Sequence, residues 1–217
     1  MAQRATPPVW KLVGPDACGL DEVGRGALAG PLVAAAVVLP KRFRHPLLRD
    51  SKLLSAEQRQ IVEPLIRRAA LAVEVVSVTV ELINDRGIGW ANRFAFERLL
   101  ELVVAPAYLL DGNLRINTER RYHSVVSGDR LVPAISAASI VAKVHRDRLM
   151  RELHPDFPHY GWEHNKGYGT PHHREAISSH GVCLHHRNAF VHLEQPELFE
   201  QEGLVEEEAL APSQRPG

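Results

Sequence analysis

The 217-residue sequence has few of the features that mark extracellular or membrane proteins. Its two cysteines, Cys18 and Cys183, are too few for a disulfide framework or a cysteine-rich zinc site, and they fit a reducing compartment. The longest apolar run, residues 32–39, is too short to cross a bilayer, and residues 1–10 contain no apolar stretch of signal-peptide length. We therefore expect a cytoplasmic protein with no membrane role.

The sequence also has no net charge, which by itself argues against a polyanionic partner. The charges are segregated, however, because residues 194–217 hold seven Glu and one Arg, which leaves 25 basic and 19 acidic side chains in residues 1–193. Residues 41–68 alone contain eight basic and three acidic residues. Such a segment predicts a surface that follows a phosphate backbone, although a solvated helix face is an equally good interpretation for any single residue.

Two adjacent acids, Asp21 and Glu22, stand between an apolar run and a glycine-rich turn. The residues before them (12–20) and those of 33–39 are typical of two neighbouring buried strands. A carboxylate beside such a sheet must be paired, hydrogen-bonded or bound to metal, because burying an isolated charge costs several kcal/mol. On spacing alone, an exposed turn is an equally good interpretation of this stretch.

The same order, an apolar strand followed by an acid, occurs twice more. Residues 107–110 lead into Asp111, and residues 121–127 lead into Asp129. A plain Asp-Gly turn is the common alternative at Asp111. The recurrence nevertheless predicts that the acids converge at one edge of a sheet, where ligands gather in α/β proteins.

Several helices are predicted around these strands. Ser55, with Gln58 three residues later, predicts a capped helix over 56–70, and Thr170 is expected to cap a helix running to His180. A valine-rich strand over 71–80 and a helix over 131–153 with Pro133 in its first turn complete the expected elements. In a further helix over 90–104 we expect these residues to lie in the core: Phe94, Leu99, Leu102 and Val103.

Two other patterns have ordinary interpretations. Lys143 and Asp147 lie one turn apart on the predicted helix 131–153, and from spacing alone they are a surface ion pair worth a few tenths of a kcal/mol. Nine of the twelve histidines lie in residues 154–192. A zinc site there is disfavoured, because the segment has neither an HExxH motif nor paired cysteines.

Clustered carboxylates repel one another in a low-dielectric site unless cations neutralise them. Mg²⁺ and Mn²⁺ prefer oxygen ligands, and two such ions about 4 Å apart can hold both the attacking water and the leaving oxygen of a phosphodiester. The acids at the strand ends therefore predict phosphoryl chemistry with hard divalent cations and no organic cofactor.

Five separated motifs, in order from about residue 18 to residue 190, resemble the ribonuclease HII family, the type 2 ribonucleases H. They are DEVGRG with LAGP, DSK-x-L, Asp-Gly after a strand, ISAASIVAKVHRD, and KGYGT. Arg25, where the type 3 enzymes carry GTG rather than GRG, favours type 2. One departure from the family pattern is the Asn188-Ala189 pair, which leaves the contacts made by the C-terminal segment open.

The resemblance implies an α/β protein with the RNase H-like fold, a mixed five-stranded sheet flanked by helices with additional C-terminal helices. It implies a catalytic domain over 13–193, which leaves an N-terminal lead over 1–12 and an acidic tail over 194–217. The Glu, Pro, Gly and Ser composition of this tail predicts that its end is disordered. The implied activity is hydrolysis of RNA paired with DNA, including a cut 5′ to a single ribonucleotide in duplex DNA that leaves a 3′-hydroxyl and a 5′-phosphate. A monomer acting on nucleic acid is expected.

The resemblance also implies residue roles. The metal-binding and catalytic acids would be Asp21, Glu22, Asp111 and Asp129, with Asp147 a supporting acid nearby. The backbone of Gly24, Arg25 and Gly26 resembles the element that reads the ribose 2′-hydroxyl. Other substrate contacts would come from Lys52, Ser139, Lys143 and Tyr168, the last stacking at the RNA–DNA junction.

Two further functions remain open at this level. A catalytically silent nucleic-acid-binding module would keep the fold and the basic residues 41–68, but intact acids at every position argue against it. A metal-dependent phosphatase acting on small molecules would use similar acids. The long basic segment and Tyr168 favour a polymeric substrate.

Overall fold

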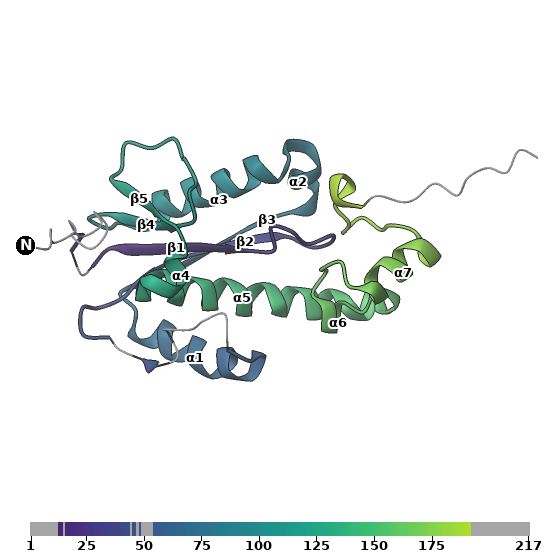
Figure 1. The fold of residues 1–217 in the computed structure, drawn as a ribbon, viewed down its shortest axis with the longest axis horizontal. Coiled ribbons are helices and arrows are strands. Elements are labelled where there is room, and N and C mark those ends of the chain that lie inside the picture. Colours follow the sequence, from purple (N-terminus) through teal and green to yellow (C-terminus); the bar gives the residue numbers. More distant parts are fainter. Residues whose placement is uncertain (1–12, 15, 44, 47, 49–53, 192–217) are drawn as a thin grey trace, which may run out of the picture.

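The computed structural model describes residues 13–14, 16–43, 45–46, 48 and 54–191 (Figure 1). Its centre is a five-stranded sheet in the order β3-β2-β1-β4-β5. The strands are β1 (Cys18–Val23), β2 (Leu32–Val38), β3 (Ala72–Val78), β4 (Tyr108–Asp111) and β5 (Tyr122–Val125). β1, β2 and β3 pair antiparallel, whereas β1, β4 and β5 pair parallel. The predicted mixed five-stranded sheet is therefore confirmed.

Helices cover both faces of this sheet (Figure 1). One layer holds α1 (Ala56–Ala69), α4 (Gly128–Leu131) and α5 (Pro133–Leu153), and the other holds α2 (Val80–Arg86) and α3 (Ile88–Leu102). β2 is buried on both sides because its side chains alternate between the two layers. Val33, Ala35 and Val37 pack with the α1 and α5 layer, and Leu32, Ala34, Ala36 and Val38 pack with α3.

The start of α5 lies directly against β1, at Gly19. A Cβ atom added at Gly19 would come within 2.2 Å of the Ala134 carbonyl carbon and 2.3 Å of the Ile135 nitrogen. Only glycine allows this approach, because a backbone atom cannot move aside as a flexible side chain can. The small residues of α5, among them Ala137, Ala138 and Ala142, continue the close packing.

A smaller C-terminal cluster packs beside the turn that joins β1 to β2. It contains α6 (Trp162–Asn165) and α7 (Pro171–His180), with 3₁₀ turns at His154–Asp156, Pro158–Tyr160 and Asn188–Phe190. Its core surrounds the fully buried Trp162. The β1–β2 turn is tied to it by main-chain bonds from Leu28 and Ala29 to the Gly167 carbonyl, at 2.8 and 3.1 Å.

Most predicted elements are present. Ser55 and Gln58 form the expected capping box of α1, and Thr170 accepts a bond from His173 N at the start of α7. Two details of the prediction are wrong. Asp21 and Glu22 lie inside β1 rather than after it, and the expected strand over 71–80 gives way to α2 at Val80.

The predicted core of residues 90–104 is wrong for two of its four residues. Leu99 and Val103 are buried, whereas Phe94 is 37% and Leu102 is 44% exposed. Phe94 instead stacks on Trp90 across one turn of α3, with ring centroids 4.8 Å apart. Trp90 is itself partly buried against the core, so Phe94 packs at the edge of the core rather than inside it.

Some predictions concern residues outside the described chain. They are the N-terminal lead over 1–12, the acidic tail over 194–217 and Lys52 in the DSK-x-L motif. Within the described part of the chain, no helix has the length and apolar character needed to cross a membrane.

Candidate active site

Three of the predicted acids line one cavity of about 300 Å³ at the carboxyl ends of β1 and β4. They are Asp21 and Glu22 from β1 and Asp111, the last residue of β4. The parallel pairing of these strands places their carboxyl ends at the same edge of the sheet. The other residues lining the cavity are Val23, Arg59, Ser139, Ile140 and Lys143.

Asp21 and Glu22 reach the cavity from opposite faces of the sheet. Successive side chains of a strand alternate, so Asp21 lies toward α5 and Glu22 toward α3. Asp21 is hydrogen-bonded to Ser139 of α5 and accepts a bond from the Glu22 main-chain N at 2.8 Å. Glu22 Oε1 accepts a bond from Asn92 Nδ2 of α3 at 3.5 Å. Each acid is thus oriented by a different layer of the fold.

Asp111 is held by the turn that follows β5. Its Oδ1 accepts main-chain bonds from Gly128 at 2.7 Å and from Asp129 at 3.4 Å. Asp129 itself lies in α4 rather than at the end of a strand, is fully buried, and is not among the residues lining the cavity. The structure thus brings Asp21, Glu22 and Asp111 together and places Asp129 behind Asp111.

Burial and neighbouring carboxylates shift the pKa values of Asp21 and Glu22. Burial raises the pKa of Asp21 well above its usual range, and the nearby Asp111 and Glu22 carboxylates raise it further, against the Ser139 hydrogen bond. Burial also raises the pKa of Glu22; Arg25 opposes this rise and Asp111 adds to it. The cavity therefore disfavours the ionised forms of Asp21 and Glu22.

Two cationic side chains share the cavity with the acids. Arg59 projects from the first turns of α1, where its Nη1 donates to the Leu54 carbonyl at 2.5 Å. Lys143 Nζ lies 2.7 Å from Asp147 Oδ1, so the predicted ion pair is formed, and both side chains are largely buried rather than exposed on the surface. Asp147 thereby fixes the position of Lys143 on the cavity wall.

The predicted recognition elements lie next to the cavity. Gly24 is buried with a φ of 87°, whereas Arg25 and Gly26 are exposed. Tyr168 is half-buried, and its ring centroid lies 5.6 Å from Lys143 Nζ. Lys143 therefore connects the acid cavity with Tyr168.

Sequence reasoning missed several residues of this region. Asn92, which contacts Glu22, is a polar residue on the buried side of α3, between Ala91 and Ala95, and this break in an apolar pattern was the available signal. Arg59 was predicted only as one member of a basic segment. Arg146 and Arg187, both fully buried, were given no role, although Arg146 lies in the motif ISAASIVAKVHRD, because bonds to main-chain carbonyls leave no pattern in the sequence.

The histidines of the C-terminal cluster are engaged with one another. The Nε2 atoms of His173 and His186 are 3.2 Å apart, and Trp162 Nε1 donates to His173 Nε2 at 3.1 Å. Burial lowers the pKa of His186 to about 4, so the ring is neutral near pH 7. Across the described residues, no group of three or more His, Cys, Asp or Glu side chains is arranged so that it could hold a metal ion, and this holds for the histidines here and for Asp21, Glu22 and Asp111 as the structure places them.

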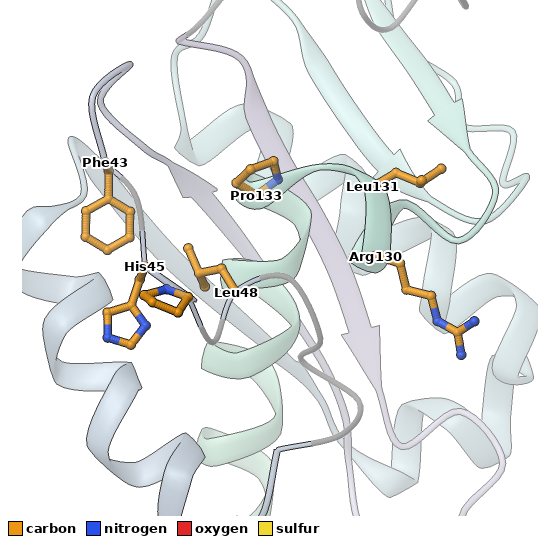
Figure 2. Close-up of a pocket in the computed structure, with 7 residues that line it drawn as sticks. Phe43, His45, Leu48, Arg130, Leu131 and Pro133 are labelled. Atoms are coloured by element: carbon orange, nitrogen blue, oxygen red, sulfur yellow. The ribbon is translucent and has the colours of Figure 1, made fainter.

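A more voluminous cavity, about 810 Å³, lies beside the start of α5 (Figure 2). Phe43, His45 and Leu48 line one side of it, and Arg130, Leu131 and Pro133 line the other. None of the three clustered acids lines it. Its wall is largely apolar, so the chemistry of the site belongs to the smaller acidic cavity.

Comparisons with known proteins agree with this geometry. The ribonuclease HII of Burkholderia mallei (strain SAVP1) is 49% identical over 175 residues, which cover 80% of this chain and 82% of that protein. The RNase HII of Archaeoglobus fulgidus, solved in complex with PCNA, superposes with a TM-score of 0.72 at 27% identity, covering 83% of this chain and 98% of that one. Bst-RNase HIII in complex with Mn²⁺ shares the fold, with a TM-score of 0.59 at 22% identity, covering 75% and 60%.

The sheet order and the cavity of carboxylates at the strand ends define a protein of the RNase H-like class. The sequence profile described as Ribonuclease HII matches residues 18–193, so the chain belongs to the ribonuclease HII family. It is therefore a type 2 ribonuclease H, a metal-dependent endonuclease that acts on RNA–DNA hybrids. The predicted family and fold are confirmed.

Proposed function

We propose that this enzyme, besides hydrolysing the RNA strand of RNA–DNA hybrids, cuts duplex DNA on the 5′ side of a single embedded ribonucleotide. The products would be a 3′-hydroxyl and a 5′-phosphate. The observation that carries the proposal is the shared cavity of Asp21, Glu22 and Asp111, whose lining residue Val23 leads directly into the turn with the exposed Arg25 and Gly26. The proposed site of hydrolysis and the proposed site of ribose recognition would therefore be adjacent.

In chemical type, although not in the side-chain arrangement of this structure, the three acids suit hard divalent cations, Mg²⁺ or Mn²⁺. All three cavity acids offer carboxylate oxygens, and their mutual repulsion is the electrostatic condition that such cations relieve. We assign Asp21, Glu22 and Asp111 as ligands and Asp129 as a fourth acid behind Asp111. Two such ions, when bound, would supply activation of a water and stabilisation of the leaving oxygen.

Neighbouring residues orient the three carboxylates and place positive charge beside them. Ser139 holds Asp21, Asn92 holds Glu22, and the main-chain N–H of Gly128 holds Asp111, so each carboxylate keeps one direction. Arg59 and Lys143 place positive charge on the wall of the same cavity, where a phosphodiester would need neutralisation. Asp147 keeps Lys143 in place.

Recognition of the substrate is assigned to two elements. The main chain of Gly24, Arg25 and Gly26 offers N–H donors to a ribose 2′-hydroxyl, the group that distinguishes RNA from DNA. Tyr168 would stack against the sugar at the RNA–DNA junction. Ser139 and Lys143 would contact the same strand beside the acids.

The test is cleavage of an end-labelled DNA duplex with one ribonucleotide, with Mg²⁺, with Mn²⁺ or with chelator, beside an all-DNA duplex of the same sequence. A metal-dependent cut only at the 5′ side of the ribonucleotide is expected. An RNA–DNA hybrid serves as the control for basal activity. Cleavage of the hybrid without cleavage at the single ribonucleotide would contradict the proposal.

A further inference from the structure

Two fully buried arginines, Arg146 of α5 and Arg187 before the last 3₁₀ turn, lie behind the Gly24–Gly26 turn. Among the described residues, neither guanidinium has a carboxylate within ion-pair distance. Every nitrogen of both groups donates instead to a main-chain carbonyl. Burying two cations without acids is costly, so their position needs a reason other than an ion pair.

Arg187 holds both ends of the β1–β2 turn. Its Nη1 donates to the Gly24 carbonyl at 2.6 Å and to the Arg25 carbonyl at 3.1 Å. Its Nε and Nη2 donate to the Gly30 carbonyl at 3.0 and 2.7 Å. One side chain, distant in sequence, thus fixes the two peptide planes that connect Gly24, Arg25 and Gly26.

These bonds determine where the N–H groups of the turn point. In a trans peptide the C=O and the following N–H point in opposite directions, and the described chain has no cis peptide. Because Arg187 binds the carbonyls of Gly24 and Arg25 from the buried side, the N–H groups of Arg25 and Gly26 point toward the exposed side. No described residue accepts a bond from either N–H. Two adjacent donors are left for a ligand.

Arg146 connects this turn to Tyr168. Its Nε and Nη2 donate to the carbonyls of Pro31 and Ala29, both at 2.9 Å, while its Nη1 donates to the Lys166 carbonyl at 2.8 Å. Its guanidinium carbon lies 5.2 Å from the centroid of the Tyr168 ring. A Cβ at Gly24 would collide with the Arg146 side chain, so the turn and this arginine are in direct contact.

We propose that Arg187 and Arg146 are positioning residues for ribose recognition: Arg187 aims the Arg25 and Gly26 N–H groups at the substrate, and Arg146 fixes their place relative to Tyr168. This inference rests on the proposed reading of a 2′-hydroxyl by the turn. Arginine is required because its planar fork of five donors can bridge separate carbonyls. Lysine carries the same charge on a single nitrogen and cannot span the Gly24 and Gly30 carbonyls together.

The test compares wild type, Arg187→Lys and Arg146→Lys for binding to two DNA duplexes in chelator, one with a single ribonucleotide and one all-DNA. The readout is the ratio of the two Kd values. The loss of about one hydrogen bond to the 2′-hydroxyl predicts a ratio reduced ~5- to 10-fold in Arg187→Lys, with the all-DNA Kd changed less than ~2-fold. Arg146→Lys is an independent second variant, because it changes the turn through Ala29 and Pro31.

Leu99→Ala is the matched control for lost stability, since Leu99 is buried in the α3 layer on the other face of the sheet. It should lower the melting temperature and leave the Kd ratio unchanged. If both lysine variants fold and keep the wild-type ratio, the positioning role is wrong. If wild type itself neither prefers nor cuts the ribonucleotide duplex, the proposed function fails instead, so the two failures are distinguishable.

Discussion

Two charged clusters lie about one turn apart along α5. They differ in whether their charged groups are bonded to other groups of the chain. Around Ser139 and Lys143, three carboxylates share a cavity, and burial together with the neighbouring carboxylates raises the pKa of Asp21 and of Glu22. Around Arg146, two buried guanidiniums have every nitrogen bonded to a carbonyl. The arginine cluster is saturated by the chain itself and serves structure. The acid cluster lines a cavity, and we propose that divalent cations and substrate complete it.

The strongest way to break this comparison is Asp111→Asn. The amide keeps an oxygen that can accept from the Gly128 N–H, so the variant should fold and bind duplex. It removes one of the three charges that attract a cation, and we expect cleavage to fall by at least about 100-fold. Single-turnover cleavage and duplex binding are measured together. Asp85→Asn, an exposed acid of α2 paired with Arg86, is the matched control and should cleave normally.

The titration of His186 and that of the cavity acids should change the stability of the fold in opposite directions as the pH falls. The pKa of His186 falls from 6.5 to about 4, so below pH 6.5 the unfolded chain binds a proton that the folded chain does not. Stability should therefore decrease as the pH falls from about 6.5 to 4, by on the order of 2–3 kcal/mol from this group. Asp21 and Glu22, with raised pKa values, contribute with the opposite sign.

The His186 contribution is isolated by comparing urea unfolding of wild type and His186→Gln between pH 4 and 7. Wild type should lose more of its unfolding free energy than the variant as the pH falls. Parallel losses in the two proteins would show that His186 titrates normally in the folded state.

A smaller effect is expected from Asp147→Asn. Lys143 would lose its partner at 2.7 Å and with it a fixed position on the cavity wall. We expect kcat to fall about 10-fold, from misplacement of one charge-assisted contact, with little change in KM. Steady-state kinetics on a hybrid separates the two constants. A change in KM alone would assign Lys143 to uniform substrate binding instead.

The smallest predicted effect belongs to Arg59→Gln. Removal of this cation from the cavity wall should weaken duplex binding about 3- to 10-fold and reduce the salt slope of log Kd by about one unit. Arg68→Gln, on the same helix but not lining the cavity, is the control and should change the slope less. Identical salt slopes for the two variants would mean that α1 lies along the phosphate backbone of the duplex without a specific contact at Arg59.

The sequence predicted much of this fold because the pattern was local. The buried strands, the Ser55 capping box and the acids near strand ends each follow from neighbouring residues. α2 was missed because Val80 continues the valine-rich run of β3, so only the Thr79 cap marks the change from strand to helix. Phe94 was misassigned because an apolar residue at helical spacing can also lie at the edge of the core, where Phe94 stacks on Trp90 and stays partly exposed.

The sequence predicted the acids of the candidate site but not the residues that hold those acids and the neighbouring turn in place. Asp21, Glu22 and Asp111 are recognisable because carboxylates beside apolar strands are rare. Asn92, Arg146 and Arg187 act through contacts between segments far apart in the chain, and their main-chain partners have no sequence signature. The position of Asp129 behind Asp111 likewise depends on the turn into α4, which periodicity does not reveal.

The most direct test of the central claim is the melting temperature as a function of Mn²⁺ concentration for wild type, Asp111→Asn and Asp85→Asn. If the acid cluster is completed by divalent cations, binding to the folded state raises the melting temperature of wild type and Asp85→Asn with rising Mn²⁺. Asp111→Asn should show a much smaller rise. An equal rise in all three proteins would place the cation elsewhere and contradict the account.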